Sequence, residues 1–197
     1  MGQERNRQLK QQREQQRKKR TILIGGGVVA VVAVVAAFIL FFPSEPDSWE
    51  QLVEEGQVAM AQVETPENQG ANHVPAGTRV PYESRFPTSG PHWPSPTRPG
   101  HYETPQPNEA LVHAIEHGNI VVYYDELSEE DEARLREWTG FYTGAWSAVI
   151  ATPEEGLGRG VVLTAWDHRM RLDEFDAAPM AAFIEAFRGR GPENPVR

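Results

Sequence analysis

Histidine is the residue type in this sequence that is best suited to chemistry. The chain has 197 residues, of which six are histidine and none is cysteine. Without cysteine there are no disulfides and no thiolates, so a transition metal would have to be held by imidazole, thioether or carboxylate groups. Five of the six histidines lie between residues 73 and 117, which predicts either a metal site or a buried hydrogen-bond network in that segment.

The most specific motif is H-x-x-x-H, formed by His113 and His117 with Glu116 inside it. In a helix, residues four apart lie on one face with Cβ atoms about 6 Å apart, so both rings can bind one cation. The apolar residues Ala114 and Ile115 predict that this helix is mostly buried. Buried imidazoles need partners, so the spacing predicts two helix ligands, with Glu116 as an orienting carboxylate or an extra ligand.

Two further histidines, His73 and His92, precede this helix in a proline-rich segment that could fold over it. Two helix ligands with one or two loop ligands would make a closed site, for which copper or zinc is the expected ion. The candidate metal ligands are His73, His92, His113, Glu116 and His117. The alternative is that the same histidines form a buried hydrogen-bond network without a metal.

Catalytic motifs are weak or absent. Residues 113–117 also match the H-x-x-E-H signature of inverted zinc peptidases, in which Glu116 would be the general base. Such peptidases are much larger, and this chain leaves little room for a substrate cleft and a distant acidic ligand. The G-x-S-x-G motif, the P-loop and the dinucleotide-binding glycine motif are absent. The sequence therefore favours a binding protein over an enzyme without deciding the question.

The elements that must position these residues follow from helix caps and from β-branched runs. The patterns predict a helix over 108–117, a strand over 119–124, a helix beginning at Ser128, strands over 147–151 and 161–166, and a helix over 178–188. This order, α-β-α-β-β-α, predicts a small single α+β domain.

The segment before the first of these helices is rich in proline. Residues 71–108 contain nine prolines, which exclude long helices and central strands. The same segment carries Tyr82, Phe86 and Trp93, whereas disordered linkers are poor in aromatic residues. We therefore expect an ordered wrap that packs on the following core, a folded domain over 71–190 and a flexible C-terminus over 191–197.

A long apolar run lies near the N-terminus. Residues 21–42, TILIGGGVVAVVAVVAAFILFF, contain no charged side chain. As a helix this run would span about 33 Å, against a hydrocarbon core of roughly 30 Å. We expect a single transmembrane helix over 21–42, followed by an acidic stalk over 43–70. A cleaved signal peptide is the rival interpretation, although its apolar region would normally be shorter and end in small residues.

Charge predicts the orientation of this helix. Residues 1–20 carry a net charge of +6 and the remainder carries −15, within a total of −9. The positive-inside bias places the basic tail in the cytoplasm and the C-terminal domain outside the cell membrane. Beside a membrane helix, a basic tail of this kind is typical of a topology signal that contacts anionic lipid, so we expect no nucleic-acid partner.

Several motifs occur in a specific succession. They are H-V at 73–74, P-T-S-G-P-H at 87–92, G-x-Y at 100–102, L-V-H-A-I-E-H-G at 111–118 and T-A-W at 164–166. In this succession the chain resembles the uncharacterised bacterial family known as domain of unknown function 3105, over residues of about 71 to 187. The resemblance implies a shared fold and an anchored, extracytoplasmic arrangement, and it gives no reaction. His101 lies at the variable position of G-x-Y and His168 lies outside the motifs, so both are weaker candidates.

Two hypotheses follow. The first is a single-pass membrane protein whose extracytoplasmic domain binds copper or zinc through the histidine cluster. The second is a non-catalytic structural or interaction domain, with its histidines in a buried network. Its partner would be another envelope protein that docks on the proline- and aromatic-rich wrap.

Overall fold

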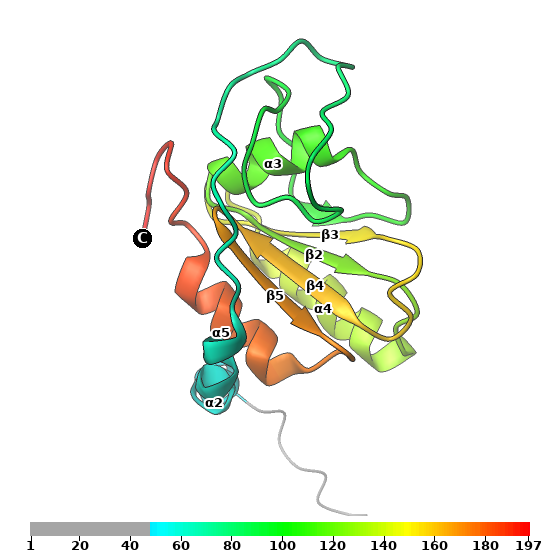
Figure 1. Cartoon of the computed structure of the whole chain (residues 1–197). Coiled ribbons are helices and arrows are strands. Elements are labelled where there is room, and N and C mark those ends of the chain that lie inside the picture. The colour runs from blue at the N-terminus through cyan, green and yellow to red at the C-terminus, as the bar shows by residue number, and fades with distance from the viewer. Residues whose placement is uncertain (1–47) are drawn as a thin grey trace, which may run out of the picture. The chain divides into compact units, whose positions relative to one another are not determined.

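The computed structural model describes residues 48–197, which form one compact unit (Figure 1). The predicted basic tail (1–20) and transmembrane helix (21–42) lie outside the described residues. Within residues 48–197, no helix combines the length and the apolar character needed to cross a bilayer.

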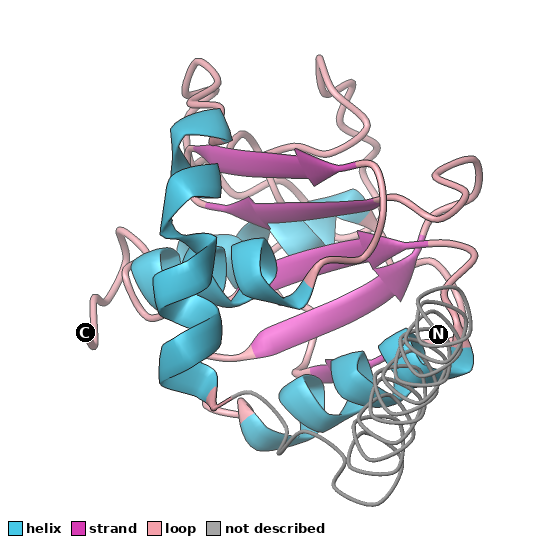
Figure 2. Cartoon of the chain, turned by 90° about the horizontal axis from the view of Figure 1, so that it is seen from below, coloured by secondary structure: helices cyan, strands magenta, loops and turns pink. Residues whose placement is uncertain are grey.

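A five-stranded sheet lies at the centre of the described residues (Figure 2). Its strands are β1 (Gly100–His101), β2 (Ile120–Tyr124), β3 (Val149–Pro153), β4 (Val161–Ala165) and β5 (His168–Leu172), in the spatial order β1-β3-β2-β4-β5. Strands β1 and β2 both pair in parallel with β3, whereas β4 is antiparallel to β2 and to β5. The sheet is therefore mixed, with β2 between a parallel and an antiparallel neighbour.

Helices cover both faces of this sheet. They are α2 (Trp49–Gly56), the 3₁₀ helix η1 (Gln57–Gln62), α3 (Asn108–Glu116), α4 (Glu129–Phe141) and α5 (Ala177–Phe187). Helices α2, α4 and α5 share a core with one face, and α3 with the proline-rich wrap covers the other (Figure 1). The domain thus has three layers, and the predicted α+β class is confirmed.

Strand β2 shows how the sequence builds the two cores. Ile120, Val122 and Tyr124 face the α4 and α5 side, and Val121 and Tyr123 face α3. All five residues are buried. A strand that is covered on both faces is apolar throughout rather than alternating, which explains the run IVVYY.

All six predicted elements are present, within a few residues of their expected bounds. The prediction missed β1, β5 and their places at the two edges of the sheet. In β5 only Met170 is buried, and Arg169 and Arg171 flank it, so the strand carries little of the apolar signal. Strand β1 has two residues, too few for any periodic pattern.

Residues expected in a stalk contribute to the core. Leu52 of α2 is 7 % exposed and packs in the core cluster that includes α5. Helix α2 approaches α5 so closely that a Cβ on Gly56 would lie 2.0 Å from the carbonyl oxygen of Ala178. Gly56 therefore allows the two helices to pack. Among the described residues the compact unit thus includes α2 from Trp49, well before the predicted domain start at residue 71.

The proline-rich wrap is held by aromatic packing and by hydrogen bonds. Phe86 is buried and meets the Tyr123 ring edge-on at 5.0 Å. The Arg169 guanidinium of β5 donates to Glu64, to Ser84 and to the carbonyl of Phe86. These contacts hold the wrap against the sheet and α3.

Candidate metal centre

Helix α3 supplies three polar side chains from one face. His113, Glu116 and the C-cap residue His117 are spaced at i, i+3 and i+4, which places neighbouring side chains together on a helix. His113 is 4 % exposed and Glu116 is 8 % exposed, so this polar face is turned inward. Helix α3 ends at Glu116, and Gly118 follows the C-cap with a φ of +100°, which is accessible to glycine at little cost.

The wrap brings two more histidines to this face. His73 and His92 form an isolated parallel β-bridge, in which the amide of Val74 donates to the carbonyl of His92 at 2.8 Å. The amide of His92 in turn donates to the carbonyl of Asn72 at 3.0 Å. This backbone pairing fixes the two rings side by side, with His92 fully buried and His73 at the surface.

Four of the five predicted ligands converge. One ligand atom from each of His73, His92, His113 and Glu116 lies within 4.8 Å of every other. The His92 and His113 ring centres are 4.9 Å apart, and the His73 ring lies 4.9 Å from His92 and 5.0 Å from His113. Two ligands bound tetrahedrally at 2.0–2.1 Å are about 3.3 Å apart, so a small adjustment would bring all four to one ion.

The His92 ring is oriented as a metal ligand would be. Its Nδ1 lies 2.9 Å from the carbonyl oxygen of Gly90, which can only accept, so Nδ1 carries the hydrogen. Nε2 lies 3.0 Å from Oε2 of Glu116, and without a proton it would present a lone pair to that oxygen. This approach lacks hydrogen-bond geometry, and Nε2 has no hydrogen-bond partner. A proton or a metal cation between the imidazole nitrogen and the carboxylate oxygen would stabilise both groups.

The His113 ring is fixed in the same way. Its Nδ1 donates to the carbonyl of Trp93 at 2.6 Å, which leaves Nε2, 3.1 Å from Nε2 of His117, as the ring nitrogen that carries a lone pair. Burial lowers the pKa of His113; the Trp93 carbonyl opposes this shift, and the neighbouring rings of His117, His92 and His73 add to it. The neutral, metal-binding form of His113 is therefore favoured.

His117, the fifth predicted ligand, belongs to an adjoining group. Its Nε2 lies 3.1 Å from Nε2 of His113 and 3.0 Å from Oε2 of Glu193. His113, His117 and Glu193 each offer a ligand atom within 4.8 Å of the others. The His117 ring stacks on Trp146 with centres 4.0 Å apart. The predicted H-x-x-x-H pair thus does lie together, but His117 faces the C-terminal segment.

Glu193 was missed by the sequence reasoning, which expected a flexible end over 191–197. In the structure the amide of Glu193 donates to the carbonyl of Glu116, and the amide of Val196 donates to that of Gly189. Nothing in the local sequence G-P-E-N-P signals this position, because the contact depends on a fold-back of the chain past Gly118.

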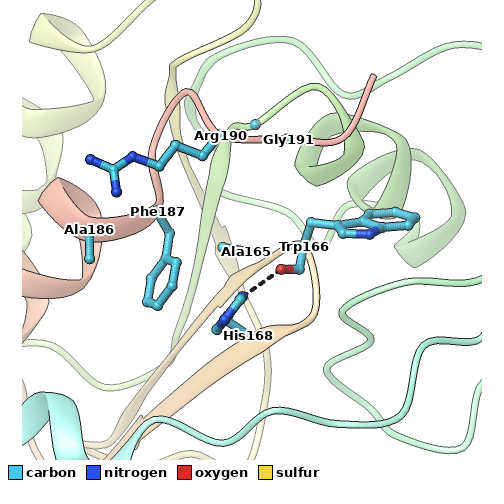
Figure 3. Close-up of a pocket in the computed structure, with 8 residues that line it drawn as sticks. Ala165, Trp166, His168, Ala186, Phe187, Arg190 and Gly191 are labelled. Carbon is cyan, nitrogen blue, oxygen red and sulfur yellow. Dashed lines mark hydrogen bonds between the residues drawn. The ribbon is translucent and has the colours of Figure 1, made fainter. Parts of the chain in front are cut away.

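The remaining histidines lie apart from the cluster. His101 on β1 faces Tyr124 at 5.1 Å. His168 lines a separate pocket of about 260 Å³, where its Nδ1 donates to the carbonyl of Trp166 at 2.7 Å and its ring stacks on Phe187 (Figure 3). Neither histidine joins a group of potential ligands in residues 48–197. This agrees with the sequence analysis, which ranked both as weaker candidate ligands.

A comparison with family models places these residues in a shared domain. The model described as "Protein of unknown function (DUF3105)" matches residues 73–197. The chain belongs to this family. The match begins at His73 and spans both groups of potential ligands, and it confirms the resemblance seen in the sequence. No curated protein and no solved structure gives a significant match.

Proposed function

We propose that this domain binds one copper or zinc ion in an inner cage formed by His73, His92, His113 and Glu116. The observation that supports this best is the nitrogen atom His92 Nε2, which is fully buried and lies 3.0 Å from a carboxylate oxygen without a hydrogen bond. A buried polar atom without a partner costs about 1–3 kcal/mol. A metal ion would satisfy His92, His113 and Glu116 at once.

The surrounding contacts would suit a metal site. Ligating histidines almost always donate their other ring N–H to a carbonyl or carboxylate, which fixes the tautomer and the ring orientation. His92 does so to Gly90 and His113 does so to Trp93. Both rings are therefore oriented before an ion arrives.

The donor set limits the identity of the ion and the chemistry. Three imidazoles and one carboxylate suit zinc or copper(II), and in a chain without cysteine no thiolate competes for the ion. Four protein ligands close a tetrahedral zinc site, whereas catalytic zinc keeps a position for water. The cage therefore fits metal retention better than hydrolysis.

We further propose that the domain works outside the cell membrane, tethered by residues 21–42, with the basic tail (1–20) at anionic lipid on the cytoplasmic side. The support is the uncharged run itself and the charge difference across it. A role in metal handling for another envelope protein would suit such a location.

The second candidate is a structural or interaction domain in which the histidines form only a hydrogen-bond network. The hydrogen bonds from His92 and His113 to carbonyl groups favour it, because a buried network contains the same bonds. In that case a docked envelope protein would be the functional partner, and the His92–Glu116 contact would hold a proton.

Metal analysis of the purified 43–197 fragment separates the two candidates. After incubation with excess Zn²⁺ or Cu²⁺ and removal of free ion, we expect one equivalent to stay bound. His92→Ala and His113→Ala should lose it, and the control His168→Ala should keep it. Absence of bound metal from the unmodified fragment with both ions would refute the metal function and leave the interaction candidate ahead.

A further inference from the structure

His113 belongs to both groups of potential ligands. Its Nδ1 is committed to the Trp93 carbonyl, so Nε2 is the one lone pair that it offers. A single lone pair binds one ion at a time. An ion held by His113 can therefore sit with His73, His92 and Glu116, or with His117 and Glu193, but not with both sets.

The two positions differ in coordination. The inner cage has four protein ligands, which fill a tetrahedral shell, whereas the outer group has three and leaves a position free. Ligand exchange needs room for the incoming donor. An ion in the outer position can be reached by water or by an acceptor ligand, and an ion in the inner cage has no such vacancy.

The ligands also differ in burial. The His92 side chain is 0 % exposed and that of Glu116 is 11 % exposed, while those of His117 and Glu193 are 14 % and 45 % exposed. The path from the inner cage through His113 to Glu193 thus leads from the interior to solvent. His73 offers a second way to the surface, but it is itself a ligand of the cage.

The outer ligands are held in place by the backbone. A Cβ on Gly191 would lie 2.1 Å from the carbonyl oxygen of Glu116, so only glycine allows the C-terminal segment to pass this close to α3. The amide of Gly189 donates to the carbonyl of Gly118 at 2.7 Å. Together with the stack of His117 on Trp146, these contacts aim Glu193 at the ring that adjoins the cage.

We propose that His117 and Glu193 form an outer metal position that shares His113 with the inner cage, and that the ion enters and leaves through it. This inference rests on the proposed metal function. The C-terminal segment then has a defined role: it supplies the carboxylate that draws the ion from the closed cage toward an acceptor.

The test is the rate at which the zinc-loaded or copper-loaded full-length chain, in mild detergent, gives up its ion to a coloured chelator. Glu193→Gln and His117→Phe, which keeps a ring on Trp146, should each slow the transfer by about tenfold. Both should retain one bound equivalent, because neither residue is a ligand of the inner cage. The matched control is Glu174→Gln, which alters an exposed carboxylate paired with Arg159.

Each outcome has one meaning. Slower transfer with full occupancy supports the outer position. An unchanged rate would show that the ion leaves past His73, and faster transfer would show that Glu193 acts as a lid; either result overturns the inference. Loss of the bound ion in Glu193→Gln would make Glu193 a ligand of the main site and overturn it as well. Failure of the unmodified chain to bind metal would refute the proposed function itself.

Discussion

Metal binding should stabilise the folded domain, and loss of His92 should remove that effect. A ligand that binds only the folded state at 100 times its Kd contributes about 2.7 kcal/mol. The described unit has about 150 residues, for which 1 kcal/mol shifts Tm by roughly 2–4 °C. We therefore expect Zn²⁺ or Cu²⁺ at that concentration to raise Tm by about 5–11 °C.

The His92→Ala variant tests the geometry. His92 supplies one of four ligands, and even residues that only orient a ligand are worth about 10–100-fold in affinity. A 100-fold loss at the same metal concentration leaves about 0.4 kcal/mol of stabilisation, or roughly 1 °C. The quantity to compare is Tm with metal minus Tm without it, because the cavity left by the substitution then cancels.

Differential scanning fluorimetry of the 43–197 fragment, with and without metal, measures this difference. His168→Ala is the matched control, because His168 is packed on Phe187 and lies outside the cluster. Its metal-dependent shift should equal that of the unmodified fragment. The reasoning fails if His168→Ala loses as much of the shift as His92→Ala, or if His92→Ala keeps it.

Three further predictions concern the metal-free fold. Burial lowers the pKa of His113 in the folded state. Its contribution to stability is therefore complete above the unfolded pKa of about 6.5 and is lost as pH falls from there toward the lowered value. Urea midpoints measured between pH 7.5 and 5 should fall less steeply in His113→Gln than in the unmodified chain. Gly56→Ala should destabilise by about 1–3 kcal/mol because its Cβ would strike the Ala178 backbone, which thermal unfolding would show. Glu64→Ala should cost about 1–3 kcal/mol in a urea titration, since it removes the carboxylate paired with the largely buried Arg169 guanidinium.

Matched controls exist for each. Gly140 lies in α4 with nothing within 4 Å of an added Cβ, so Gly140→Ala should be neutral or stabilising by about 0.5 kcal/mol. Equal losses at both glycines would contradict the packing argument. Glu174→Ala breaks an exposed pair and should cost about 0–0.5 kcal/mol. A flat pH profile for the unmodified chain would contradict the His113 prediction.

The elements of this fold could be predicted because their signals are local. The cap at Ser128, the run IVVYY and the apolar face of α5 each lie within a few residues of the element they define. Strand β5 could not be found in this way, because Arg169 is held by hydrogen bonds to Glu64 and to the wrap rather than by apolar packing. The docking of α2 likewise depends on Gly56 meeting Ala178 across the chain.

The candidate metal site likewise has a part that local sequence predicts and a part that depends on long-range contacts. His113, Glu116 and His117 follow from helical spacing, so the sequence predicts their common face. His92 comes close to the α3 histidines because its backbone pairs with that of His73. The order of motifs in the sequence indicated only that the segment carrying His92 could fold over the helix. Glu193 reaches His117 because Gly191 passes close to Glu116. This contact joins residues far apart in the sequence, so no local sequence pattern predicts it.

If the proposed metal site exists, the position of Glu116 favours metal retention over proteolysis. If residues 113–117 were the H-x-x-E-H motif of a zinc peptidase, Glu116 would activate a water molecule and could not itself be a metal ligand. Here its Oε2 lies 3.0 Å from the unpartnered Nε2 of His92, and it is a member of the inner group. A carboxylate that completes a four-ligand cage cannot also serve as the base for a zinc-bound water, because no ligand position is left for that water. In the proposed function, therefore, the inner cage would retain the ion, and an open coordination position would arise only if His117 and Glu193 took the ion over.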